Sequence, residues 1–316
     1  MSKSDKNRAY HFKRLSSENL GDLEKLHAAV YGKEPAAGFF LKKYDTAFTG
    51  IGHVGYIAYN DEGLPVAFYA VIPCFMQFDD KIVLSAQSAD TMTHAEYRNK
   101  GLFVELAQLT FKLCESVGVR FVFGFPNQNS LPGFINKLGW ELTERMDCFI
   151  IEGAAFQWSA VLNKFSILRK LYDSYCQIVL KKYLLSQTGI ANTVFGDGFA
   201  GVYRDQYFLK YKTYTNTCVI KTGNSIVWMK INGMLLIGDM EVKPGDFEDT
   251  MLKITKLARK LGIKEIHFHA SPGTTLHKLF AAHFKSIPSF PCIFKDFEGN
   301  TPVNKIKFTS ADIDTF

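Results

Sequence analysis

The hydrophobic pattern of the first half of the chain alternates between the period of a strand and the period of a helix. Residues 10–15 alternate like a short strand, and apolar residues at helical spacing follow them until Gly32. A second helix is expected after Pro35, because a proline ring suits the first helical turn. Three strands joined as a meander are expected next, in residues 54–60, 64–78 and 81–94.

The same alternation continues to about residue 152. Apolar residues from Leu102 to Leu113 recur with a helical period, and Gly118 closes this helix. A buried strand, a short helix that Asn129 or Ser130 caps, and a further strand are expected in residues 120–125, 129–139 and 146–151.

The second half partly repeats this order. Residues 154–188 contain no Pro or Gly and predict a helical linker, 153–190, between a domain at 1–152 and another at 191–316. The second domain is expected to contain a helix, a meander, a helix, a strand and a helix, in residues 203–214, 218–242, 246–262, 264–270 and 274–284. The shared order predicts a duplicated α/β fold (α+β mixed), in which each copy is a twisted, mostly antiparallel sheet flanked by helices. The terminal residues 312–316 are expected to be disordered.

Composition narrows the class of protein. The 316 residues are 47% hydrophobic and 14% aromatic, enough for a substantial core. The net charge is +6, with the cations scattered, so a small anionic ligand fits as well as nucleic acid, and we expect no nucleic-acid partner. Six dispersed cysteines, no signal peptide and no membrane-spanning run predict a cytoplasmic protein.

Two glycine-containing segments are candidate phosphate-binding loops. Residues 50–55, GIGHVG, match GxGxxG, but a helical segment precedes them and a strand follows. A dinucleotide-binding loop needs the opposite order, so this segment is expected to be a connecting loop. Residues 97–103, YRNKGLF, do join a strand to the start of a helix, where unpaired amides and the helix dipole favour an anion. Gly101 would let a ligand approach the backbone closely.

Residues 89–103, ADTMTHAEYRNKGLF, together with RFVFGF and NQNSLPGFINKLGW, resemble the GNAT superfamily of acetyl-CoA-dependent N-acyltransferases over roughly residues 10–150. The superfamily's Q/RxxGxG/A motif is matched by Arg98 and Gly101, with Phe103 in place of a small residue. A second hallmark, an Asn before a short helix that ends in a FYEKLGF-like string, is matched by Asn129 and FINKLGW.

The resemblance implies a sheet that splays after its fourth strand and leaves a slot for coenzyme A. The backbone of Thr91, Met92 and Thr93 would pair with the pantetheine arm. The amides of the helix start would hold the pyrophosphate. The expected coenzyme-binding residues are therefore Thr91, Met92, Thr93, Arg98, Asn99, Lys100, Gly101, Leu102, Phe103 and Asn129.

The sequence departs from the superfamily at two positions. At Phe103, either the loop is wider than usual or the ring turns away into the core. Ile135 occupies the position where many members place a tyrosine that protonates the departing thiolate. Thiolate is a good leaving group, so that acid can be dispensable.

Asp90 is the expected catalytic base, because some members carry a carboxylate on the corresponding strand; a structural hydrogen bond to a neighbouring loop is the alternative. His94 is the second candidate for the base. His267 and His269 share one face of a strand, but no third ligand stands at a recognisable spacing, so no metal is assigned.

The expected function is the transfer of an acetyl group from acetyl-CoA to the amine of a small acceptor. The second half lacks an RxxGx loop and would shape the acceptor site, where Tyr203, Tyr207 and Tyr211 suit an amino sugar or nucleotide sugar. Two alternatives remain open. One is a non-catalytic acyl-CoA-binding module of the same fold, and the other is a tandem-fold aminoacyl transferase of the peptidoglycan-bridge type.

Overall fold

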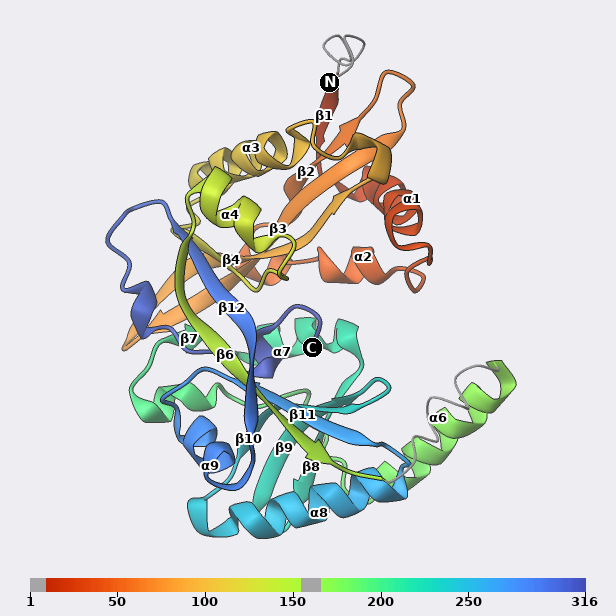
Figure 1. Ribbon diagram of the computed structural model, residues 1–316, viewed down its shortest axis with the longest axis vertical. Helices are drawn as coiled ribbons and strands as arrows, with labels where there is room; N and C mark the ends of the chain where they lie inside the picture. Colours follow the sequence, from red (N-terminus) through yellow and green to blue (C-terminus); the bar gives the residue numbers. More distant parts are fainter. Residues whose placement is uncertain (1–9, 155–165) are drawn as a thin grey trace. The chain divides into compact units, whose positions relative to one another are not determined.

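The computed structural model describes residues 10–154 and 166–316, which form two compact units. The first unit is built from Met1–Met76, Ile82–Thr143 and Cys292–Val303, and the second from Gln77–Lys81, Glu144–Pro291 and Asn304–Phe316. Residues 155–165 of the expected linker lie outside the described residues, and α6, Ser166–Leu180, follows them (Figure 1). The division at 1–152, 153–190 and 191–316 stays a prediction.

The sheet of the first unit has the order β1-β2-β3-β4-β5-β12. Its strands are β1 His11–Arg14, β2 Val54–Tyr59, β3 Pro65–Phe78, β4 Lys81–Thr93, β5 Phe121–Gly124 and the end of β12, Ser286–Asp296. β1 and β2, β2 and β3, and β5 and β12 are antiparallel, whereas β4 and β5 are parallel. The predicted strands of the first half are confirmed, and Gly50–His53 is the expected connecting loop before β2.

Four helices accompany this sheet: α1 Leu20–Tyr31, α2 Phe39–Lys43, α3 Leu102–Ser116 and α4 Leu131–Leu138. α1 ends at Gly32 in the left-handed conformation, as expected. α2 is shorter than predicted, because Gly38 takes a φ of 69° at its start and the helix ends at Tyr44.

The sheet of the second unit has the order β6-β11-β10-β9-β8. Its strands are β6 Glu141–Glu152, β8 Thr217–Thr222, β9 Ser225–Ile231, β10 Leu235–Glu241 and β11 Glu265–Ala270, and a short β7 comprises Gly201–Val202. Of the neighbouring strands in this order, β10 and β11 are parallel, and the other three pairs are antiparallel. Its helices are α6, α7 Gln206–Tyr211, α8 Phe247–Lys260 and α9 Thr275–His283, so the predicted mixed α/β class is confirmed.

Strand β12 was not predicted from the sequence. Its segment SIPSFPCIFKD contains Pro288 and Pro291, which lack the N–H of a strand residue and obscure the alternation. Its last residues, Ile293–Asp296, pair with β5 in the register Ile293↔Gly124. A segment late in the chain therefore completes the sheet of the first unit.

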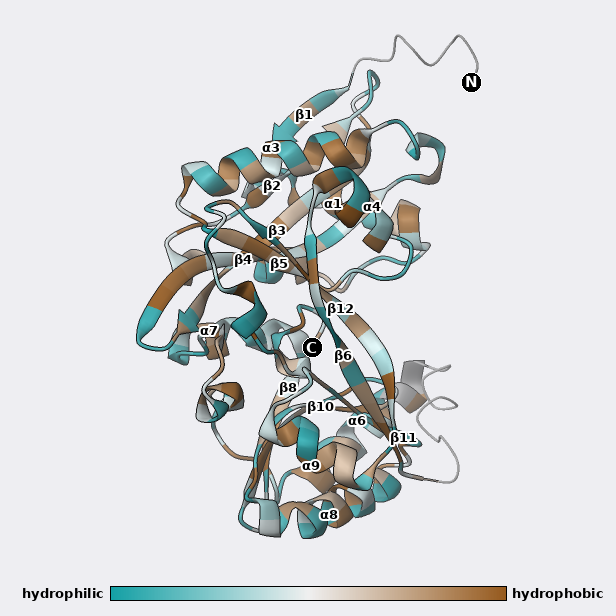
Figure 2. Cartoon of the chain, turned by 60° about the vertical axis from the view of Figure 1, so that its left-hand side comes forward, coloured by the Kyte–Doolittle hydropathy of each residue, from teal (hydrophilic) through white to brown (hydrophobic). Residues whose placement is uncertain are grey.

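Each unit has its own hydrophobic core. In the first, Leu106 and Phe111 of α3 pack with Tyr69 of β3 and Trp140. In the second, Phe149, Phe268, Phe280, Phe247 and Ile254 belong to one cluster beneath α8 and α9. Figure 2 shows the alternating hydrophobic and hydrophilic stripes along α3 and α8 that this one-sided burial requires.

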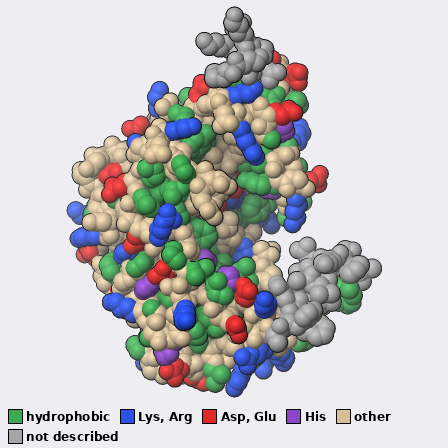
Figure 3. All heavy atoms as spheres, in the orientation of Figure 1, with side chains coloured by type: hydrophobic (Ala, Val, Ile, Leu, Met, Phe, Trp, Pro, Cys, Tyr) green, Lys and Arg blue, Asp and Glu red, His purple; other side chains and the backbone are tan. Residues whose placement is uncertain are grey.

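Charged side chains of both signs are interspersed over the face of each unit that Figure 3 presents. This distribution agrees with the scattered cations of the sequence. No helix among the described residues is both long enough and apolar enough to cross a membrane.

The expected disorder of residues 312–316 is wrong. Phe316 is 0% exposed, and its ring packs edge-on against Trp228 at 5.2 Å between centroids. Lys230 Nζ donates to the Thr315 carbonyl at 2.7 Å, and the buried Arg204 donates to Asp312 at 2.8 Å. Burial of an aromatic ring and satisfaction of backbone carbonyls hold this segment on the second unit.

We expect Phe316→Ala to lower the free energy of unfolding by about 3–5 kcal/mol, because it leaves a cavity against Trp228. Urea unfolding followed by Trp fluorescence measures this loss. Ile287, which is 54% exposed, provides the control, since Ile287→Ala should change stability by no more than about 0.5 kcal/mol. Equal effects of the two substitutions would contradict a docked Phe316.

Candidate functional site

Strand β4 carries Asp90 to Thr93, and its pairing with β5 stops short of them. Among the described residues, the parallel register is Ala86↔Val122 and Gln87↔Phe123. Asp90 has a φ of 49°, in the left-handed region, which interrupts the regular strand. The two strands therefore separate before Asp90, and one edge of β4 beyond it lacks a strand neighbour in the described part of the chain.

The loop before α3 contains two residues in the left-handed conformation. Asn99 has a φ of 63°, and Gly101, at the N-cap of the helix, has a φ of 85°. The amides of Val104 and Glu105 donate to the Gly101 carbonyl at 3.0 and 3.2 Å. The amides just ahead of them lie before these first intrahelical bonds, so the helix end offers donors to an anion. A Cβ built on Gly101 would meet no atom within 4 Å.

Two cations flank this helix end. Arg98 is exposed, and its Nε donates to the Thr93 carbonyl at 3.4 Å, so its side chain lies back toward the end of β4. Lys100 Nζ lies 5.4 Å from the ring centroid of Tyr97. Positive charge and the amides that precede the first intrahelical bonds thus occur together at the start of α3.

The ring of Phe103 turns into the core, which is one of the two arrangements expected from the sequence. It packs edge-on against Phe134 at 5.2 Å and Tyr69 at 6.1 Å between centroids. A Cβ at Gly133 of α4 would lie only 3.1 Å from this ring, so the glycine makes room for it. The bulky residue therefore supports the junction of α3 and α4, and its ring lies away from the loop.

Asn127, which was not predicted from the sequence to have a role, organises the start of α4. Its Oδ1 accepts hydrogen bonds from the amides of Asn129 and Ser130 at 2.9 and 3.0 Å. Ser130, one of the two predicted caps, is the N-cap residue of α4, but its side chain accepts no hydrogen bond from the first turn, and the carboxamide of Asn127 forms the turn that precedes it. The side chain of Asn129 is exposed, and its role toward the coenzyme stays a prediction.

Asp90 forms a closely bonded group with two residues of the α2 segment. Lys43 Nζ lies 2.8 Å from both carboxylate oxygens, and Tyr44 Oη donates to Oδ2 at 2.8 Å. Lys43 is 1% exposed and Asp90 21%. The ammonium of Lys43 and the carboxylate of Asp90 therefore form an ion pair. Burial and the charge of Asp90 raise the pKa of the nearby Tyr31.

The sequence held a signal for this group. Phe40, Lys43 and Tyr44 have the i, i+3, i+4 spacing of one helical face, so a lysine stands on an apolar stripe. A lysine buried in this way requires a counter-charge. Which carboxylate supplies that charge depends on tertiary packing, because Asp90 is 47 residues away.

The second candidate base, His94, is partly buried beside Tyr97, with 5.8 Å between ring centroids. Its Nδ1 is buried and has no hydrogen-bond partner in the described structure.

Ile135, at the position where many members of the superfamily place a tyrosine, packs against the core of the first unit. Tyr69 approaches the separating strands, with its hydroxyl 3.0 Å from Ser88 Oγ, and its full burial raises its pKa.

Residues 11–143 match the sequence model of the acetyltransferase (GNAT) domain. Among curated proteins, none is similar to this chain in sequence.

The whole chain is similar in structure to several solved proteins. A GCN5-related N-acetyltransferase from Kribbella flavida aligns with a TM-score of 0.54 and 11% identity over 92% of this chain and 72% of that one. A second, from Anabaena variabilis, aligns with a TM-score of 0.54 and 14% identity over 91% and 73%. A probable N-acyltransferase from Enterococcus faecalis aligns with a TM-score of 0.56 and 14% identity over 92% and 73%. At sequence identities of 11–14%, the structural similarity shows that these proteins and this chain share a fold.

We expect Asp90→Asn to lower the free energy of unfolding by about 3 kcal/mol, because it removes the carboxylate that forms an ion pair with the buried ammonium of Lys43. The double variant Lys43→Met/Asp90→Asn should recover a large part of this loss, since it removes both charges. Urea unfolding measures both, with the exposed Asp61→Asn as the control. A single variant as stable as the parent would contradict a buried ion pair.

Proposed function

We propose that this chain, whose residues 11–143 match the acetyltransferase (GNAT) domain, moves an acetyl group from acetyl-CoA to the amine of a small acceptor. The observation that carries the proposal is the start of α3. There, left-handed Asn99 and Gly101 lie beside Arg98 and Lys100, just ahead of the amides that precede the first intrahelical bonds of α3. That combination suits a diphosphate.

Coenzyme A would bind along β4 and the start of α3. The pyrophosphate would accept hydrogen bonds from the amides of residues 99–103, with Arg98 and Lys100 adding positive charge. The amide groups of the pantetheine arm would pair with the backbone of Thr91–Thr93, as an added strand does at an uncovered sheet edge. This arrangement would bring the thioester close to Asp90.

Transfer requires a neutral amine, a polarised carbonyl and a departing thiolate. A backbone N–H near Met92 would stabilise the oxyanion that forms when the amine attacks the thioester carbonyl. Asp90 is the proposed base, with Lys43 as its counter-charge. Its task would be to attract and orient the amine and to accept its proton as the new bond forms.

The acceptor is proposed to be an amino sugar or a nucleotide sugar. Tyr207 of the second unit is exposed, whereas Tyr211 packs between Phe208 and Tyr214. Tyr207 is therefore the aromatic residue of this group best able to stack on a sugar or base. The inward ring of Phe103 removes one reason for favouring a non-catalytic module.

Acyl transfer is tested directly by the release of free thiol from acetyl-CoA with a panel of amines. We expect release that depends on the acceptor. Binding of the coenzyme without release would identify a binding module. Indifference to coenzyme A, with activity on aminoacyl-tRNA, would identify the aminoacyl transferase.

Gly101→Ala is expected to raise the Kd for acetyl-CoA about tenfold or more, because a Cβ would disfavour the left-handed backbone and crowd the anion site. Gly118→Ala is the matched control, since Gly118 follows the other end of α3 with a φ of 83° and equally open surroundings. The backbone strain is similar in both variants. A rise in Kd for Gly101→Ala alone, measured by isothermal titration, would therefore reflect an effect on the binding site and not on the strain of the helix. Equal Kd values would contradict coenzyme binding at residues 98–103.

The kinetic role of Asp90 is tested in the Lys43→Met variant. In that background, Asp90→Asn removes the remaining charge of the ion pair. We expect Lys43→Met/Asp90→Asn to lower kcat/KM about 100-fold or more relative to Lys43→Met, as for loss of a general base. The rise of kcat/KM with pH that reports on the base should also change. Equal activity and equal pH profiles would assign Asp90 a purely structural role.

A further inference from the structure

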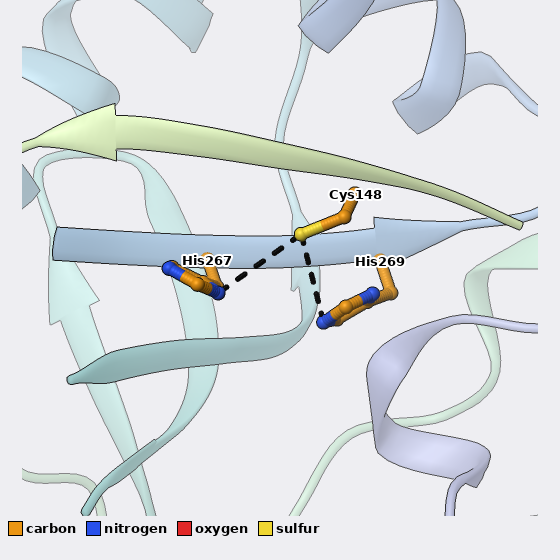
Figure 4. A group of neighbouring side chains, drawn as sticks. All are labelled: Cys148, His267 and His269. Carbon is orange, nitrogen blue, oxygen red and sulfur yellow. Dashed lines mark hydrogen bonds between the residues drawn. The ribbon is translucent and has the colours of Figure 1, made fainter. Parts of the chain in front are cut away.

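The sheet of the second unit brings a thiol and two imidazoles together on one face (Figure 4). Cys148 of β6 is paired with His269 of β11, and His267 is the next residue along β11 on the same face. Phe149 and Phe268 point to the other face, into the core. The alternation of two antiparallel strands therefore places all three side chains together.

The three side chains approach one another through potential ligand atoms. Cys148 Sγ lies 3.7 Å from His269 Nε2 and 4.0 Å from His267 Nδ1, and all three atoms lie within 4.8 Å of one another. A tetrahedral zinc ion, with Zn–S of about 2.3 Å and Zn–N of about 2.0 Å, separates sulfur from nitrogen by about 3.5 Å. The two sulfur–nitrogen separations are therefore within about 0.5 Å of this value, and the two nitrogens, which lie within 4.8 Å of each other, would approach to about 3.3 Å on a bound ion.

Neighbouring groups determine which nitrogen of His269 carries a hydrogen. Ser289 Oγ donates its hydrogen to the Met146 carbonyl at 3.1 Å. It can therefore only accept from His269 Nδ1, at 3.0 Å. That bond fixes the hydrogen of neutral His269 on Nδ1, so the lone pair of Nε2 points toward Cys148.

The other imidazole is oriented by a carboxylate. His267 Nε2 lies 3.0 Å from Glu265 Oε2, so the hydrogen of neutral His267 is held on Nε2 and the lone pair of Nδ1 points toward Cys148. Carboxylate–histidine pairs of this kind orient metal-bound imidazoles. One thiol hydrogen can satisfy only one of two nitrogen lone pairs, whereas a cation would satisfy both.

We propose that Cys148, His267 and His269 bind a zinc ion, with Glu265 and Ser289 orienting the two imidazoles and the fourth position left to water or another ligand. A thiolate with two imidazoles is a donor set that suits zinc and excludes calcium and magnesium. The thiol of Cys148 would lose its proton to solvent when the metal binds. The ion would link β6 to β11 within the second unit.

No metal was expected from the sequence, because no third ligand stands near His267 and His269 along the chain. Cys148 lies 119 and 121 residues before them in the chain, so spacing could not reveal it. Only the antiparallel register of β6 and β11 brings the thiol to the histidines.

The test uses the full chain, stripped of metal with a chelator and then titrated with zinc in competition with a chromophoric chelator. We expect one zinc ion per chain with a submicromolar Kd. Cobalt, used as a spectroscopic substitute, should give a thiolate-to-metal charge-transfer band. Absence of zinc binding at micromolar concentration, or a cobalt spectrum without the thiolate band, would overturn the proposal.

Matched variants separate this site from adventitious binding. Cys148→Ser should remove the charge-transfer band and weaken zinc binding about 100-fold, whereas Cys218→Ser, a thiol of β8 outside the cluster, should leave both unchanged. Glu265→Gln should weaken binding about 10-fold or more without removing a ligand. Glu265→Gln still tests the site if Cys148→Ser does not fold. Unchanged affinity in Cys148→Ser or Glu265→Gln, or equal losses in Cys218→Ser, would contradict the assignment.

Discussion

The parallel pairing of β4 with β5 ends after Gln87, and the proposed coenzyme site depends on that separation. A strand inside a sheet satisfies its backbone groups on both edges, so it cannot bind a ligand through them. Where β4 leaves β5, one edge beyond Asp90 becomes available to the amides of an extended ligand. The start of α3 follows a few residues later and offers a second set of backbone donors.

Two features keep this polar backbone in place. On one side, the ring of Phe103 packs against Tyr69 and Phe134, so the first turn of α3 is fixed to the core beneath it. On the other side, the Lys43–Asp90 pair ties the end of β4 to α2. Hydrophobic packing and an ion pair thus support both sides of the loop of residues 98–101, which leads into the first turn of α3.

The second unit shows how the two faces of one sheet take different roles. The face that carries Phe149 and Phe268 builds the core with α8 and α9. The opposite face of the same two strands presents Cys148, His267 and His269. Because side chains alternate along a strand, one pair of strands can supply both a hydrophobic core and a polar cluster.

The sequence alone determined the elements that follow a regular period. The helix beginning at Leu102, the strand and turn signals around it, and the glycine that opens the helix are local features, encoded within a few residues of one another. For the same reason the sequence could predict an anion site at Arg98 and Gly101 and a connecting loop at residues 50–55, and the structure confirms that residues 50–53 form the loop before β2.

The tertiary structure decided the features that join distant residues. It directed the ring of Phe103 into the core, paired Lys43 with Asp90, placed β12 beside β5 and brought Cys148 to two histidines. None of these follows from a period, because each depends on which buried surfaces and charges meet once the chain has folded. Local spacing specifies the elements of this protein, and long-range packing decides which side chains share a site.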